Sequence, residues 1–145
     1  MIDNSVNIDP PSPSMFQSVT EQCIVETANR FSLPEIILKA ILEVEGGKTG
    51  ELRVNSNGTY DIGPMQVNSI WLPKFTNYIT SERILYDSCA NLQIGAWILR
   101  YNVNKANGDI WQGVSSYHSS TPAHQEKYRN KIYAAIQKIN TTKKT

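Results

Sequence analysis

The sequence predicts a mainly α-helical domain that carries one small β-hairpin flap. Apolar residues recur at helical spacing in several segments, and Ile37, Ile41 and Val44 form one such face. Residues 88–103 are apolar nearly all round, which is typical of a central, buried helix. The turn signal Asn57-Gly58 lies between short polar and β-branched runs, which favours a tight hairpin turn with positive φ.

The composition is that of an ordinary globular domain. The 145 residues are 40% hydrophobic and 19% charged, and a net charge of +1 gives no support to nucleic-acid binding. The charge is uneven, since residues 1–70 hold four Lys or Arg against nine Asp or Glu, and residues 71–145 hold ten against four. A basic second half can favour an anionic polymer, but a solvated helix face with a Lys-rich tail is the simpler explanation.

The chain divides into three regions. Residues 1–14 are polar and contain prolines, so we expect a flexible arm there, followed by one domain at 15–140 and a basic tail at 141–145. No apolar run approaches the roughly 20 residues that a membrane span requires. The first residues lack the basic and apolar regions of a signal peptide, so the chain is either cytoplasmic or a mature domain with an added Met.

Two helices are predicted before the hairpin. The first covers residues 15–31. The string Ser32-Leu-Pro-Glu35 matches a capping box, in which Ser32 caps the helix and Glu35 reaches back to it. The second helix is therefore predicted from Leu33 to Glu45, and Gly46-Gly47 ends it.

The second helix carries two candidate acids, Glu43 and Glu45. Glu43 falls on a polar stripe, where Lys39 is a partner one helical turn away. Glu45 falls beside Leu38 and Leu42, and an apolar flank raises the pKa of a carboxyl group. The negative end of the helix dipole acts in the same direction. Glu45 is therefore the better candidate for a general acid near neutral pH, the alternative being an exposed residue at a helix end.

The segment after the hairpin combines amides with an apolar side chain. Gly63-Pro64 interrupts the strand, and residues 65–68 are expected to enter a helix or turn. Gly63 allows a ligand to approach the backbone, Met65 offers an apolar floor, and Gln66 and Asn68 offer amides. This mixture suits sugar rings, although each residue taken singly has a loop or core explanation.

The second half of the chain is predicted to be helical. Residues 74–86 form a loop with a short helical piece, and Gly95-Ala96 in the buried helix lets a neighbour pack closely. Asp109 caps a short helix through Tyr117, and a last helix starts near Pro122 and carries Tyr128. The total is five or six helices with no internal repeat.

Several chemistries find no support in the sequence. His118 and His124 are not spaced to share a helix face and no acidic cluster joins them, so a metal site is not expected. There is no phosphate loop, dinucleotide fingerprint or nucleophile elbow, so no cofactor is expected. Carboxylate chemistry remains. Cys23 and Cys89 either form one disulfide, worth roughly 4 kcal/mol, or are two buried thiols.

At this point three strings, AILEVEGG, NSNGTYDIGPMQVNSIWLP and CANLQIGAWILRYN, show a resemblance to a known family. The chain resembles the family 1 lytic transglycosylases (SLT domain), and more narrowly the small members that accompany secretion, conjugation and pilus systems. The resemblance covers residues 20–136. It implies a lysozyme-like, mainly helical fold, peptidoglycan glycan strands as substrate, and components of such a machine as possible partners.

The resemblance also implies roles for individual residues. The family's catalytic acid falls on Glu45. Its substrate-binding positions fall on a set of groove and helix residues, namely Gly63, Met65, Gln66, Asn68, Tyr117 and Tyr128. Its paired cysteines fall on Cys23 and Cys89, which implies a disulfide and hence a periplasmic or secreted protein. The sequence departs from the family's pattern with Gly46 in place of Ser, Pro64 in place of Leu and His118 in place of Asn.

The implied reaction is non-hydrolytic cleavage of the bond between N-acetylmuramic acid and N-acetylglucosamine by one acid, with a 1,6-anhydro product. Asp61 could serve as a second carboxylate, but capping of a turn is the favoured role for it. The alternatives are a goose-type-like lysozyme, which uses water, an inactive peptidoglycan-binding or secretion scaffold module, and a helical adaptor.

Overall fold

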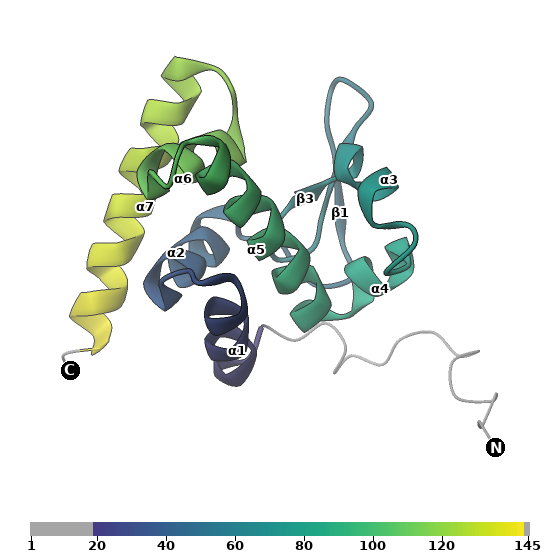
Figure 1. The fold of residues 1–145 in the computed structure, drawn as a ribbon, viewed down its shortest axis with the longest axis horizontal. Coiled ribbons are helices and arrows are strands. Elements are labelled where there is room, and N and C mark those ends of the chain that lie inside the picture. The colour runs from purple at the N-terminus through teal and green to yellow at the C-terminus, as the bar shows by residue number, and fades with distance from the viewer. Residues whose placement is uncertain (1–18, 144–145) are drawn as a thin grey trace.

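The structure is a computed structural model that describes residues 19–143 (Figure 1). Helices dominate this part of the chain and one small sheet interrupts them. The elements in order are α1 (Glu21–Phe31), α2 (Glu35–Glu45), β1 (Leu52–Val54), β2 (Tyr60–Ile62), β3 (Val67–Asn68), the 3-10 helix η2 (Ser69–Trp71), α3 (Leu72–Phe75), α4 (Ser81–Tyr86), α5 (Ser88–Lys105), α6 (Ile110–His118) and α7 (Pro122–Lys143). The predicted fold class, a mainly α lysozyme-like domain, is confirmed.

Helix α5 is the centre of the packing. It packs against α1, α4 and α6, while α2 packs against α7, and Figure 1 shows α7 and the sheet on opposite sides of α5. Leu92, Ala96 and Leu99 are fully buried, as expected for a helix that is apolar all round. A Cβ on Gly95 would lie 2.7 Å from the Cβ of Met65, so the predicted close approach is confirmed, and it involves the segment that follows β2.

The junction between α1 and α2 differs from the prediction. Ser32 is not a helix N-cap but the left-handed C-cap of α1, with φ 54° and ψ 48°. The N–H of Leu33 then donates to the carbonyl of Ala28, which turns the chain and buries Leu33. Pro34 occupies the N-cap of α2 and no side chain caps this end, so the predicted capping box is wrong. The start of α1 also differs, because Thr20 caps it by accepting from the N–H of Cys23.

The flap is larger than the predicted hairpin. Its turn is not a tight two-residue turn, because the N–H of Asn55 bonds to the carbonyl of Thr59 and closes a longer loop. Within that loop only Gly58 has positive φ. The Asn57 side chain accepts a hydrogen bond from the N–H of Thr59. Residues 65–68 do not enter a helix: after a turn, Val67–Asn68 add a third strand. The antiparallel order is β1-β2-β3.

Other details also revise the sequence-based picture. Lys39 and Glu43 do not pair, because Lys39 bonds to Glu21 at 2.6 Å and Glu43 to Lys138 at 2.7 Å. The short helical piece expected within residues 74–86 is present as α4, and the additional α3 brings the α-helices of the described chain to seven. The predicted cap of α6 is confirmed, since Asp109 accepts from the N–H of Gln112.

A disulfide joins the first helix to the central one. Cys23 of α1 and Cys89 of α5 are bonded, with their Cα atoms 5.8 Å apart, which confirms the pairing that the family resemblance implied. Within residues 19–143 no helix combines the length and apolar character of a membrane span. The predicted arm at residues 1–14 lies outside the described residues.

Candidate active site

A cleft of about 430 Å³ opens where the sheet faces the end of α2 and the helix α6. It collects most of the polar residues that the sequence singled out. The residues around it are Glu45, Arg53, Asn55, Asp61, Gln66, Val67, Asn68, Trp71, Ile98, Tyr117 and His118. Four predicted site residues, Glu45, Gln66, Asn68 and Tyr117, therefore share one cleft. Gly63, Met65 and Tyr128 do not line it and contribute from behind.

Glu45 is the last residue of α2, and its pKa is raised from 4.5 to about 7. Burial is the largest cause, because it disfavours the charged carboxylate. A hydrogen bond from Tyr128 opposes this shift by stabilising the charged form, and the nearby charge of Asp61 adds to the shift. The chain can turn away directly after the acid because Gly46 adopts the left-handed conformation, with φ 62°.

Tyr128 of α7 supports the acid from behind. Its hydroxyl donates to Oε2 of Glu45 at 2.7 Å, and its side chain is 2% exposed. Burial raises the pKa of Tyr128, and the charge of Glu45 raises it further, so the hydroxyl stays protonated as a donor. The ring of His118 stacks on that of Tyr128, with centroids 4.4 Å apart. Burial lowers the pKa of His118 and the positive charge of Lys131 lowers it further, which favours the neutral ring.

The floor turn, residues 63–66, is held from two sides. The hydroxyl of Tyr117 in α6 donates to the carbonyl of Met65 at 2.6 Å. The N–H of Met65 donates to Oδ1 of Asn91 in α5 at 2.8 Å. Met65 itself is fully buried, so it supports the floor turn from below and exposes no apolar surface to the cleft.

Gln66 gives the floor turn an unused acceptor. Its Nε2 donates to the carbonyl of Gly63 at 2.9 Å, and it adopts positive φ at 51°. Its Oε1 is buried and, within the described residues, has no hydrogen-bond partner. A Cβ on Gly47 would clash with the carbonyl of Gly63 and with this amide, so the chain after the acid lies directly against the floor turn.

A row of polar residues crosses the sheet and faces the cleft. Arg53 in β1 is the direct partner of Asp61 in β2, and Asp61 is the direct partner of Asn68 in β3. The amide of Asn68 donates to Oδ1 of Asp61 at 3.0 Å. The sequence favoured a turn-capping role for Asp61, but its hydrogen-bond partner in the described structure is this side chain, and Asp61 lies in the cleft beside the acid.

Arg53, Trp71 and Asn91 are among the contributors that were not assigned from the sequence. Trp71 lines the cleft and packs edge-on against Trp97, with centroids 6.1 Å apart. Asn91 is fully buried in α5, and its amide donates to the carbonyls of Ile62 and Ile84. A polar residue in a helix that is apolar nearly all round was a signal for Asn91. Nothing local marks Arg53, because its role depends on strand register.

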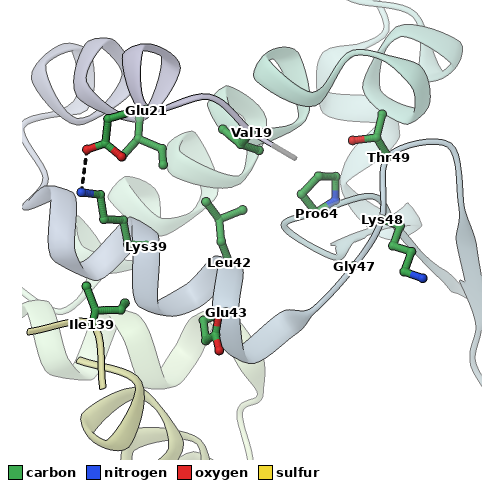
Figure 2. A pocket seen from close by; sticks show the side chains of 11 residues that line it. Val19, Glu21, Lys39, Leu42, Glu43, Gly47, Lys48, Thr49, Pro64 and Ile139 are labelled. Atoms are coloured by element: carbon green, nitrogen blue, oxygen red, sulfur yellow. Dashed lines mark ion pairs between the residues drawn. The ribbon is translucent and has the colours of Figure 1, made fainter. Parts of the chain in front are cut away.

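A second cavity, of about 440 Å³, is lined by residues of α1 and α2 and by the segment that follows α2 (Figure 2). Figure 2 shows the ion pair of Glu21 and Lys39 at one end and Lys48 with Thr49 at the other. Pro64 lines this cavity and not the cleft, so the departure from the family's Leu points away from the acid. Among residues 19–143 no group of three acidic, His or Cys side chains could hold a metal ion.

Comparison of the sequence with known proteins identifies its family. A family model described as "Transglycosylase SLT domain" matches residues 22–140. Invasion protein IagB of Salmonella typhimurium is 28% identical over 123 residues, which cover 81% of this chain and 76% of that protein. Protein IpgF of Shigella flexneri is 30% identical over 111 residues, which cover 75% and 72% respectively. The chain therefore belongs to the transglycosylase SLT domain family.

Proposed function

We propose that the protein is a peptidoglycan lytic transglycosylase, a glycosidic-bond lyase. It cleaves the β-1,4 bond between N-acetylmuramic acid and N-acetylglucosamine and leaves a 1,6-anhydro-muramoyl end. Family membership supports the reaction class. The observation that carries the proposal is the environment of Glu45, which faces the cleft with a pKa of about 7. A carboxyl group that is half protonated near neutral pH can both give and take a proton.

In the first step Glu45 transfers its proton to the bridging oxygen, and the bond from that oxygen to C1 of the muramoyl unit breaks. The electron pair stays with the departing glucosaminyl oxygen. The acetamide oxygen of the muramoyl unit stabilises the cationic C1. In the second step the C6 hydroxyl oxygen attacks C1 and its proton returns to Glu45. Water is not consumed, and no second protein carboxylate is required, unlike in most glycosidases.

The residues around the acid divide into groups that contact sugar and groups that position the acid. Gln66 and Asn68 line the cleft, where amide side chains can hydrogen-bond to sugar hydroxyls. Tyr128 holds the Glu45 carboxyl through its hydrogen bond. The hydroxyl of Tyr117 donates to the carbonyl of Met65, so Tyr117 influences the site by holding the floor turn in place.

Asp61 supports a second candidate function, hydrolysis of the same bond. Its carboxylate shares the cleft with Glu45, which is the arrangement of paired acids that lysozyme-type glycosidases use. In that case Asp61 would stabilise the cationic sugar while water attacks C1. A module that binds peptidoglycan without cleaving it is the remaining alternative.

The proposed site of action is the periplasm or the cell exterior. The disulfide between Cys23 and Cys89 supports an oxidising compartment. A role beside a secretion apparatus is suggested by the resemblance to the small members of the family, and one relative, of Salmonella, is named an invasion protein. We propose that the protein opens the cell wall locally for a secretion, conjugation or pilus machine.

Mass spectrometry of digested sacculi tests the proposal. We expect wild-type protein and the Glu43→Gln control to release 1,6-anhydro-muramoyl products, and Glu45→Gln to release at least a hundredfold less. Glu43 is a matched control, because it is in the same helix and its partner is the exposed Lys138. Reducing muramoyl ends would identify the hydrolase instead. Intact sacculi after incubation with wild type would identify the binding module.

A further inference from the structure

The flap presents a cation to the cleft. Direct partners in an antiparallel sheet project to the same face, so Arg53, Asp61 and Asn68 form one row across the three strands. All three line the cleft. The residues on either side of Arg53 are exposed on the other face, Leu52 at 50% and Val54 at 77%. Strand alternation therefore directs the guanidinium of Arg53 towards the substrate side.

The side chain of Arg53 has no ion-pair or hydrogen-bond partner within residues 19–143. The ion pairs in this part of the chain involve Lys39, Arg83 and Lys138, and no side-chain hydrogen bond of Arg53 accompanies them. Its neighbour in the row, Asp61, is bonded to Asn68. A guanidinium offers a planar fork of donors that matches a carboxylate in geometry and charge. The cleft therefore holds an open site for an anion, close enough to Glu45 for the two charges to interact.

The proposed substrate carries carboxylates on only one of its two sugars. N-acetylglucosamine is neutral. The muramoyl unit carries a lactyl group, which ends either in a free carboxylate or in an amide-linked stem peptide with carboxylates of its own. A cation at a fixed distance from the acid therefore distinguishes the two sugars by charge. Charge complementarity of this kind sets the register of a bound chain.

We propose that Arg53 is a specificity-determining residue that binds a carboxylate of the muramoyl unit and thereby sets the register of the glycan strand. The proposal rests on the proposed function for its substrate class. Binding places the muramoyl C1, and not the glucosaminyl C1, at Glu45. The carboxylate is either that of the lactyl group or one of the stem peptide, and both present the same chemistry to the guanidinium.

Binding measurements in a Glu45→Gln background test this inference without relying on turnover. Three glycan oligomers of equal length serve as probes: one with intact stem peptides, one freed of them by an amidase so that lactyl carboxylates are exposed, and one with all carboxylates converted to methylamides. The variants are Arg53→Gln, Arg53→Lys and the control Arg83→Gln. The control substitution removes the same charge, but Arg83 lies in α4 and pairs with Asp87.

We expect Arg53→Gln to raise the Kd about tenfold for a carboxylate-bearing oligomer, equivalent to about 1.4 kcal/mol, and to leave the Kd of the methylamide oligomer unchanged. Arg53→Lys should retain part of the affinity, and Arg83→Gln all of it. A loss confined to the intact oligomer identifies the stem carboxylates as the ligand. A loss confined to the stem-free oligomer identifies the lactyl carboxylate.

Two outcomes would overturn the inference: an equal loss for all three oligomers, or no loss for any. They are distinct from failure of the proposed function. If wild type leaves sacculi uncleaved while the charge-dependent loss is seen, the transglycosylase proposal fails and the binding role of Arg53 stands. If anhydro products form and the Kd values do not respond, only the role of Arg53 fails.

Discussion

The hydroxyl of Tyr128 donates a 2.7 Å hydrogen bond to Oε2 of Glu45, a residue 83 positions away in the chain. Two opposing effects meet at this bond. Burial stabilises the protonated carboxyl, while the donor stabilises the carboxylate, and the outcome is a pKa of about 7. The hydrogen bond from α7 to the end of α2 thus limits the rise in pKa that burial causes.

Removing the Tyr128 hydroxyl should change the pH dependence of the proposed reaction. Tyr128→Phe keeps the ring but removes the bond that lowers the pKa of Glu45, so this pKa should rise. The acid must be protonated to act, and the alkaline limb of kcat/KM should therefore move to higher pH. We expect kcat to fall roughly ten- to a hundredfold, because the carboxyl is no longer held in position. Tyr133→Phe, which alters the exposed hydroxyl of a tyrosine in the same helix, is the control; an unmoved alkaline limb in Tyr128→Phe would contradict the assigned role.

Glu45 should make the protein less stable as the pH rises. Its pKa is about 7 in the folded protein against 4.5 for an ordinary Glu, so between these values the folded state keeps a proton that the unfolded chain has lost. This contribution is fully present below the lower value and is lost as the pH rises through the higher one. It amounts to at most about 3 kcal/mol.

The measurement is urea unfolding of wild type and Glu45→Gln at about pH 5 and about pH 8. The free energy of unfolding of the variant, relative to that of wild type, should be higher at about pH 8 than at about pH 5, because Gln cannot ionise. His118, whose lowered pKa acts in the opposite sense as the pH falls, is present in both proteins and cancels. Parallel pH profiles for the two proteins would disprove the burial of a titrating carboxyl.

Loss of the disulfide should destabilise the fold. The bond spans 66 residues, which corresponds to about 4 kcal/mol on the chain-entropy estimate. Cys23→Ala with Cys89→Ala should lower the free energy of unfolding by a comparable amount. Reductant should have the same effect on wild type and none on the double variant. If reductant destabilised both proteins equally, its effect would not come from this disulfide.

Two adjacent glycines should respond differently to the same substitution. A Cβ on Gly47 would strike the carbonyl of Gly63 and the amide of Gln66, whereas a Cβ on Gly46 would meet nothing within 4 Å. Gly46→Ala should cost only about 1 kcal/mol for its positive φ. Gly47→Ala should also displace the floor turn and lower kcat/KM at least tenfold. Thermal unfolding and product release, measured on both variants, test this contrast, and equal activities would contradict it.

The apolar character of residues 88–103 on all sides was enough to identify the central helix. Helical periodicity was enough to separate Glu45 from Glu43, because that distinction depends on which side of a single helix a residue occupies. The capping box at Ser32 failed because the burial of Leu33 turns the chain there, and a local motif does not report that packing. The pairing of Arg53 with Asp61 depends on strand register, and neither residue carries a local mark of it.

Asn91 joins three segments that are far apart in the chain. Its one amide accepts from the floor turn through the N–H of Met65 and donates to the carbonyls of Ile62 in β2 and Ile84 in α4. A fluctuation that frees any one of these segments breaks a bond to the same buried group. We therefore expect the opening of the flap, the floor turn and α4 to be coupled through this side chain.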